Sequence, residues 1–174
     1  DIYVSERGKS GEWSNPKPLG KTVNTTYRES SAFMSADGKF LFFSSSRPNG
    51  FGGSDLYVSP SIGKGKWGAP INMGPKINTE FDEDSPVLSF DGRTLYFSSK
   101  GHRGMGGYDI YVTKYDDVNK EWSSPENLGY PINTPGNDTY YIVSPDKISS
   151  YYASVKAKGV GDIDIYQILP LGEE

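Results

Sequence analysis

A tripeptide of aspartate, an apolar residue and tyrosine occurs four times in this chain at almost equal intervals. The copies begin at Asp1, Asp55, Asp109 and Asp164, which are 54, 54 and 55 residues apart. A constant period of this length indicates stacked structural units of one kind. It also means that a recurring residue is assigned first to the structure of the repeat, before any functional site is considered.

The other landmarks of the repeat keep the same interval. Each unit has a tryptophan three residues before a proline, then a leucine or methionine followed by glycine, then Asn-Thr, an acidic residue, a Ser-x-Asp turn and a glycine-rich stretch. The tryptophans are Trp13, Trp67 and Trp122, and the acidic residues are Glu29, Glu83 and Asp138. So many aligned positions show that the whole chain is built on one repeat.

Each unit is predicted to form four short strands. Apolar and aromatic runs alternate with clusters of Gly, Asp, Asn and Pro, which is the pattern of strands and turns. The first strand of each unit is expected at 31–35, 85–89 and 139–144, and the second strand at 40–44, 94–98 and 150–154. The third strand begins at each Asp-x-Tyr, and the fourth lies around each tryptophan. Asp37-Gly38 and Asp91-Gly92 suit tight hairpins, whereas Lys147 replaces the glycine in the last unit and predicts a different turn.

Four-stranded units of about fifty residues in series predict an all-β fold, a β-propeller with blades of four antiparallel strands. The blades are assigned as residues 1–25 (the last two strands of a first blade), 26–79, 80–134 and 135–170 (the first three strands of a last blade), with 171–174 as the exit. Closed propellers have about four to eight blades. We therefore expect this chain to be part of a larger propeller, with a ring completed by a second chain as the alternative.

The chain also resembles a known family over essentially its whole length, most closely in the copy from Trp67 to Tyr111. Ser89-x-Asp91-Gly92-x-x-Leu-Tyr-Phe-Ser-Ser, Gly104-x-Gly-Gly-x-Asp-Ile-Tyr-Val and Trp122-x-x-Pro-x-Asn-Leu-Gly-x-x-Ile-Asn-Thr are similar to the WD40-like propeller repeat of TolB-type proteins. The closest version belongs to Bacteroidetes-type OmpA-family cell-envelope proteins, some of them associated with type IX secretion. The resemblance implies the propeller fold and a periplasmic or outer-membrane-associated location in a Gram-negative bacterium. It implies little about activity, because one fold hosts many functions.

Composition excludes some partners. The net charge is −4, and Lys and Arg are scattered, so nucleic-acid binding is not expected. No apolar run is long enough for direct membrane insertion. There is no Cys and one His, so no disulfide, no Cys- or His-cluster metal site and no cofactor are expected.

Candidate binding residues lie in the longer connections. The fourth-to-first connections (19–29, 73–83, 128–138) and the second-to-third connections (45–53, 99–107, 153–161) share one face of a propeller, which we call the long-loop face. Long loops on a rigid scaffold commonly carry binding sites. The second-to-third loops offer Arg47, Phe51, His102, Arg103 and Met105, a mixture enriched in protein interfaces. The alternative is that these loops fold back on their blades and leave the long side chains solvated.

Carboxylates give a second set of candidates. Glu29, Glu83 and Asp138 are expected at the channel mouth, where they could hold a cation or a basic peptide group. Their recurrence favours the alternative, in which each accepts hydrogen bonds from its own loop. Asp82 and Asp84 flank Glu83 in one blade only, which makes that blade the best candidate for ligand contact.

Other recurring residues are expected to be structural. The aspartate of each Asp-x-Tyr is predicted to cap the glycine turn through backbone amides. The tryptophans are predicted to pack between blades, with carbohydrate stacking as the alternative. His102 is the single His, and no Gly-x-Ser-x-Gly elbow accompanies it, so a Ser-His-Asp triad is not expected.

The sequence therefore predicts a non-catalytic scaffold that binds another envelope protein or peptide. A glycan or peptidoglycan-fragment binding module is the alternative, and a hydrolase, or the accessory propeller of one, is third.

Overall fold

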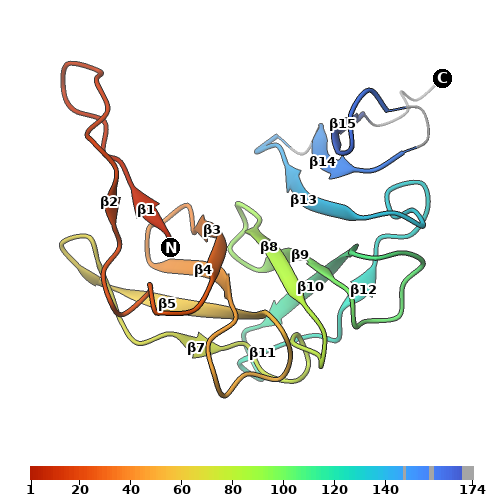
Figure 1. Ribbon diagram of the computed structural model, residues 1–174, viewed down its shortest axis with the longest axis horizontal. Coiled ribbons are helices and arrows are strands. Elements are labelled where there is room, and N and C mark those ends of the chain that lie inside the picture. Colours follow the sequence, from red (N-terminus) through yellow and green to blue (C-terminus); the bar gives the residue numbers. More distant parts are fainter. Residues whose placement is uncertain (147, 157–158, 170–174) are drawn as a thin grey trace.

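The computed structural model describes residues 1–146, 148–156 and 159–169, and these residues form antiparallel sheets with no helix. The sheets follow one another in chain order (Figure 1). The first blade has β1 (Tyr3–Val4) and β2 (Lys17–Pro18). The second has β3 (Glu29–Met34), β4 (Phe40–Ser45), β5 (Asp55–Gly63), β6 (Lys66–Trp67) and β7 (Ile71–Asn72).

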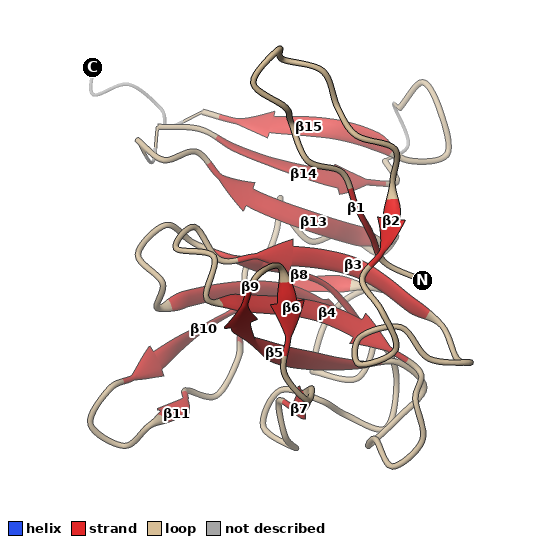
Figure 2. Cartoon of the chain, turned by 90° about the vertical axis from the view of Figure 1, so that its left-hand side faces the viewer, coloured by secondary structure: helices blue, strands red, loops and turns tan. Residues whose placement is uncertain are grey.

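The third and last blades repeat this order. The third has β8 (Glu83–Leu88), β9 (Thr94–Ser99), β10 (Asp109–Asp116), β11 (Glu121–Trp122) and β12 (Glu126–Asn127), and the last has β13 (Asp138–Val143), β14 (Ser150–Ser154) and β15 (Asp164–Ile168). Figure 2 shows the sheets in layers, with β13, β14 and β15 side by side at one end. The all-β fold of propeller blades that the period predicts is confirmed. The turn at Lys147 and the exit at 171–174 lie outside the described residues.

The fourth strand differs from the expectation. It is split into two short pieces that both pair with the third strand, β6 and β7 with β5, and β11 and β12 with β10. Pro70 and Pro125 lie between the pieces, and proline cannot donate a ladder hydrogen bond. In the first blade Trp13 makes only an isolated bridge, to Arg7.

The first strand begins earlier than expected and contains a bulge. β3, β8 and β13 start at the acidic residues Glu29, Glu83 and Asp138, which are thus part of the strand. Just after each start the register shifts, and one residue takes positive φ: Ser31 (48°), Ser85 (53°) and Tyr140 (57°). A bulge bends the strand and increases its twist. No glycine marks these positions, so the sequence gives no sign of the bulge.

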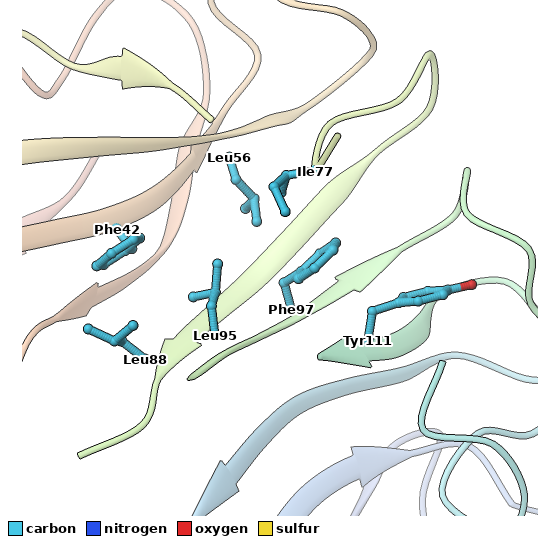
Figure 3. Close-up of a cluster of buried hydrophobic side chains, with 7 residues drawn as sticks. All are labelled: Phe42, Leu56, Ile77, Leu88, Leu95, Phe97 and Tyr111. Carbon is cyan, nitrogen blue, oxygen red and sulfur yellow. The ribbon is translucent and has the colours of Figure 1, made fainter. Parts of the chain in front are cut away.

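The hydrophobic core lies between blades. Figure 3 shows one cluster, in which Phe42 and Leu56 of the second blade meet Leu88, Leu95, Phe97 and Tyr111 of the third, with Ile77 from the connecting loop. A second cluster joins the first two blades and contains Val23, Phe43 and Tyr57. Trp67 and Trp122 pack against these clusters, as predicted, whereas Trp13 is 68% exposed.

The outer face of the last sheet is open in the structure. Leu56 and Ile110, at equivalent positions of β5 and β10, are fully buried by the following blade, whereas Ile165 of β15 is 80% exposed. This is the face that a further blade or a second chain would cover, and that neighbour stays a prediction.

At some glycines the backbones of two blades approach so closely that a Cβ atom has no room. A Cβ on Gly52 would lie 2.2 Å from the Phe81 carbonyl oxygen and 2.5 Å from that of Thr79. Gly52→Ala should therefore lower the free energy of unfolding by about 1–3 kcal/mol, measured by urea denaturation. Gly8→Ala is the matched control, because its Cβ would meet nothing nearer than 3.6 Å, and it should leave stability unchanged or slightly raised. Equal effects of the two substitutions would contradict this packing.

Candidate functional site

The recurring carboxylates are buried inside the loops that the sequence assigned to them. Glu83 accepts hydrogen bonds from the Thr79 amide (2.8 Å), the Thr79 hydroxyl (2.7 Å) and the Ser99 hydroxyl (2.6 Å). The equivalent residues of the other repeats make the same hydrogen bonds: Thr25 and Ser45 donate to Glu29, and Thr134 and Ser154 donate to Asp138. All three carboxylates are almost fully buried. Each carboxylate thus accepts hydrogen bonds from its own chain, as the alternative favoured by their recurrence describes, and a role in holding a cation or a basic peptide group stays a prediction.

The asparagine before each of these threonines completes a joint between blades. Asn78 accepts from the Leu56 amide (2.8 Å) and donates to the Leu56 carbonyl (3.0 Å), as a neighbouring strand would. Asn24 makes the same two hydrogen bonds with the backbone of Ile2, and Asn133 makes them with the backbone of Ile110. The Asn-Thr pair thus ties the third strand of one blade to the first strand of the next.

Asp82 and Asp84 are also used within the chain. Asp84 is half-buried and accepts from the Ser44 hydroxyl of the preceding blade (2.8 Å) and from the Ser85 amide (2.7 Å). Asp82 pairs with Lys100 at 2.8 Å. Ligand contact through these two residues would therefore compete with existing bonds.

Arg47 and His102, predicted as partner contacts, have one structural role together with Lys156, although His102 stands one residue later in its repeat than Arg47 and Lys156 do in theirs. Each reaches from the second-to-third loop to a carbonyl oxygen of the fourth-to-first loop: Arg47 Nη2 to Val23 (2.7 Å), His102 Nε2 to Ile77 (2.9 Å), and Lys156 Nζ to Pro131 (3.2 Å). Each also lies against an aromatic pair, Phe43 with Tyr57, Phe97 with Tyr111, and Tyr152 with Tyr166. The available signal was a basic side chain two or three residues after the serine that ends each second strand, Ser45, Ser99 and Ser154.

A catalytic triad is not assembled around His102. The Ser99 hydroxyl is buried and donates to Glu83, and it accepts from the backbone amide of His102 rather than from its ring. A nucleophilic serine requires a hydrogen bond from its hydroxyl to the ring nitrogen of the base. The arrangement therefore holds the loop and does not activate the serine.

The glycine loops fold back while three of the predicted side chains project from them. Asp55 accepts from the amides of Phe51 (2.6 Å) and Gly52 (3.1 Å), and Asp109 accepts from those of Met105 (2.9 Å) and Gly106 (3.1 Å), which confirms the predicted caps. Phe51 is nevertheless 49% exposed and Met105 45%. Arg103 is exposed and has no hydrogen bond or ion pair among the described residues.

Two further aromatics on this face were missed by the sequence reasoning. Tyr27 and Phe81 occupy one repeat position, two residues after the loop threonine, and both are about half exposed. The Phe81 carbonyl accepts from the Gly53 amide (3.0 Å), which brings its loop against that of Phe51. The recurring aromatic at this position was the signal that could have found them.

Within residues 1–146, 148–156 and 159–169, no group of three His, Cys, Asp or Glu side chains is arranged to hold a metal ion. The same part of the chain contains no helix that could cross a membrane.

Burial raises the pKa of the Glu83 carboxyl, although hydrogen bonds from Ser99 and Thr79 oppose this effect. The folded chain thus holds this proton more tightly than the unfolded chain, so the stabilising contribution is present below the unfolded-state pKa and is lost as pH rises through the folded-state pKa. Compared with Glu83→Gln, the wild type should lose unfolding free energy as pH rises from about 4 to about 7. The measurement is urea denaturation of wild type and Glu83→Gln across this pH range, with Glu80→Gln as the control for the loss of one charge. If the unfolding free energy of the wild type minus that of Glu83→Gln stays constant or grows with pH, the prediction is refuted.

The cations of the long-loop face should separate into two classes. Arg47→Ala should lower the free energy of unfolding by about 1–3 kcal/mol, because it removes charged hydrogen bonds and a stacked guanidinium. Arg103→Ala should change it by less than about 0.5 kcal/mol. Thermal or urea unfolding of both variants is the measurement, and similar losses would show that Arg47 is as free as Arg103.

The fold is similar to that of solved propeller proteins. No family model matches the chain, and no curated protein matches it in sequence. A protein described as a TolB from Agrobacterium tumefaciens has a TM-score of 0.58 and 19% identity over 97% of this chain and 57% of its own. An α-L-arabinofuranosidase from Lactobacillus brevis has a TM-score of 0.55 and 16% sequence identity. The match covers 92% of this chain and 57% of the arabinofuranosidase.

A third structure is a puromycin-hydrolyzing peptidase from Mycobacterium tuberculosis, with a TM-score of 0.52 and 20% identity over 99% of this chain and 29% of its own. The chain thus spans little more than half of the first two proteins and less than a third of the peptidase. These likenesses show the fold alone, and the chain shares propeller blades with a TolB-like protein and with two hydrolases.

Proposed function

We propose that this chain is a non-catalytic β-propeller module that binds another protein through its long-loop face. The observation that carries the proposal is a division among the predicted residues. The ionisable groups that could do chemistry, Glu83 and His102 among them, are engaged in hydrogen bonds that hold the blades. The exposed side chains of this face include several apolar and aromatic ones, together with Arg103, which is unpaired among the described residues.

The composition of this exposed set supports a protein partner. The set consists of Tyr27, Phe51, Phe81, Met105 and Val160, from two repeat positions, together with Arg103. Aromatic residues, methionine and arginine are the types enriched at the cores of protein interfaces. The repeat places them on successive blades, so a partner could contact several blades at once.

We infer a periplasmic or outer-membrane-associated location, which rests on the sequence resemblance and on the TolB-like neighbour. The partner is then another protein of the envelope, and membership of a secretion assembly would be one form of this role.

The experiment is capture from envelope extract of the source bacterium on the immobilised chain, followed by a dissociation constant for the purified partner. The double variant Phe51→Ala, Arg103→Ala should weaken binding by about tenfold or more. Phe90→Ala is the matched control, because Phe90 is an exposed aromatic on the opposite face. If Phe90→Ala weakens partner binding as much as the double variant does, the proposal is wrong. Binding of muropeptides instead of a protein would favour the glycan-binding alternative.

A further inference from the structure

A groove lies between the second and third blades on the face opposite the long loops. It has a volume of about 370 Å³, and its walls come from β4 and β5 on one side and from β8, β10, β11 and the turn before β9 on the other. The lining that matters here is Phe40, Phe42, Leu88, Arg93, Tyr115 and Trp122. Phe42 and Leu88 also form one end of the inter-blade cluster in Figure 3, so the groove opens directly onto the packed core.

Two aromatic residues of this groove depart from the repeat. Phe40 stands where the third blade has Thr94, and it is 43% exposed. Tyr115 stands where the second blade has Ser61, and its ring lies 5.2 Å from that of Trp122. Neither aromatic side chain is therefore required for a blade to form, and each adds an aromatic wall to this one seam.

The side-chain hydrogen-bonding groups of the groove are two that only donate, the Trp122 indole N–H and the Arg93 guanidinium, and the Tyr115 hydroxyl, which can donate or accept. The Tyr115 hydroxyl and the Trp122 indole N–H have no hydrogen-bond partner among the described residues, and Trp can only donate. Arg93 is the only charged lining residue, and its Nε already pairs with Asp117. The lining includes no carboxylate or amide side chain. The groove thus matches an uncharged, apolar group that brings hydrogen-bond acceptors with it.

We propose that this groove binds an aromatic or leucine side chain of a partner peptide, whose backbone carbonyl oxygens accept hydrogen bonds from Tyr115, Trp122 and Arg93. The volume is at the small end of ligand pockets, about 300–1,000 Å³, which suits one or two side chains. Trp, Tyr and Arg are also the residues enriched at binding hot spots. A sugar is a poorer match, because its hydroxyl donors would find few acceptors here and would be buried unpaired.

The test uses defined peptides and the whole chain. Acetyl-Gly-Phe-Gly-amide and acetyl-Gly-Leu-Gly-amide are titrated into ¹⁵N-labelled protein, and the Trp122 indole resonance, identified from Trp122→Phe, is followed. Both peptides should shift it saturably, and acetyl-Gly-Ala-Gly-amide should bind at least about tenfold more weakly. The absence of a saturable shift, or a larger shift with the trisaccharide of N-acetylglucosamine, would overturn the proposal.

Variants taken from the repeat itself sharpen this test. Phe40→Thr and Tyr115→Ser install the residues found at the equivalent positions of the other blade, so the fold should accept them. Each should weaken peptide binding by about fivefold to tenfold. Tyr3→Ala, at an exposed aromatic residue of the first blade, is the matched control and should leave binding unchanged; an equal loss there would count against the groove. This site stands or falls independently of the long-loop face.

Discussion

The joint between blades is the interaction on which the rest of this structure depends. Three consecutive residues make it, and Ile77, Asn78 and Thr79 show how. Ile77 packs in the apolar cluster between two blades. Asn78 makes two hydrogen bonds with the backbone of Leu56, in the third strand of the blade that the chain leaves. Thr79 donates to the carboxylate of Glu83, the first residue of the next blade's first strand. A buried charge is stable only when hydrogen bonds replace its lost hydration. The loop and the two blades therefore hold one another in place.

This joint explains why recurring polar residues are poor guides to function here. A carboxylate such as Glu83, a serine such as Ser99 and a histidine such as His102 lie close together, which by composition alone resembles a catalytic centre. Their hydrogen bonds are internal and recur with substitutions in other blades, where Arg47 and Lys156 take the place of histidine. Function is better sought where blades differ or where side chains project without partners.

Sequence reasoning was strongest where the period acted directly on backbone geometry. It predicted the strand order, the capping role of Asp55 and Asp109, and the inter-blade packing of two tryptophans. It missed the bulge at Ser85, because a positive φ without glycine leaves no mark in one sequence. It could not distinguish a surface arginine from one stacked on Phe43 and Tyr57, as Arg47 is, because the two look alike until loop and blade are placed in space.

Hydrogen exchange of the loop threonine amides tests the account most directly. The amides of Thr25, Thr79 and Thr134 lie outside the strands, yet each donates to a buried carboxylate. If these joints hold the blades together, the three amides should exchange as slowly as those of the central strands and only through global unfolding. Exchange at the rate of exposed loop amides such as that of Arg103 would contradict the account.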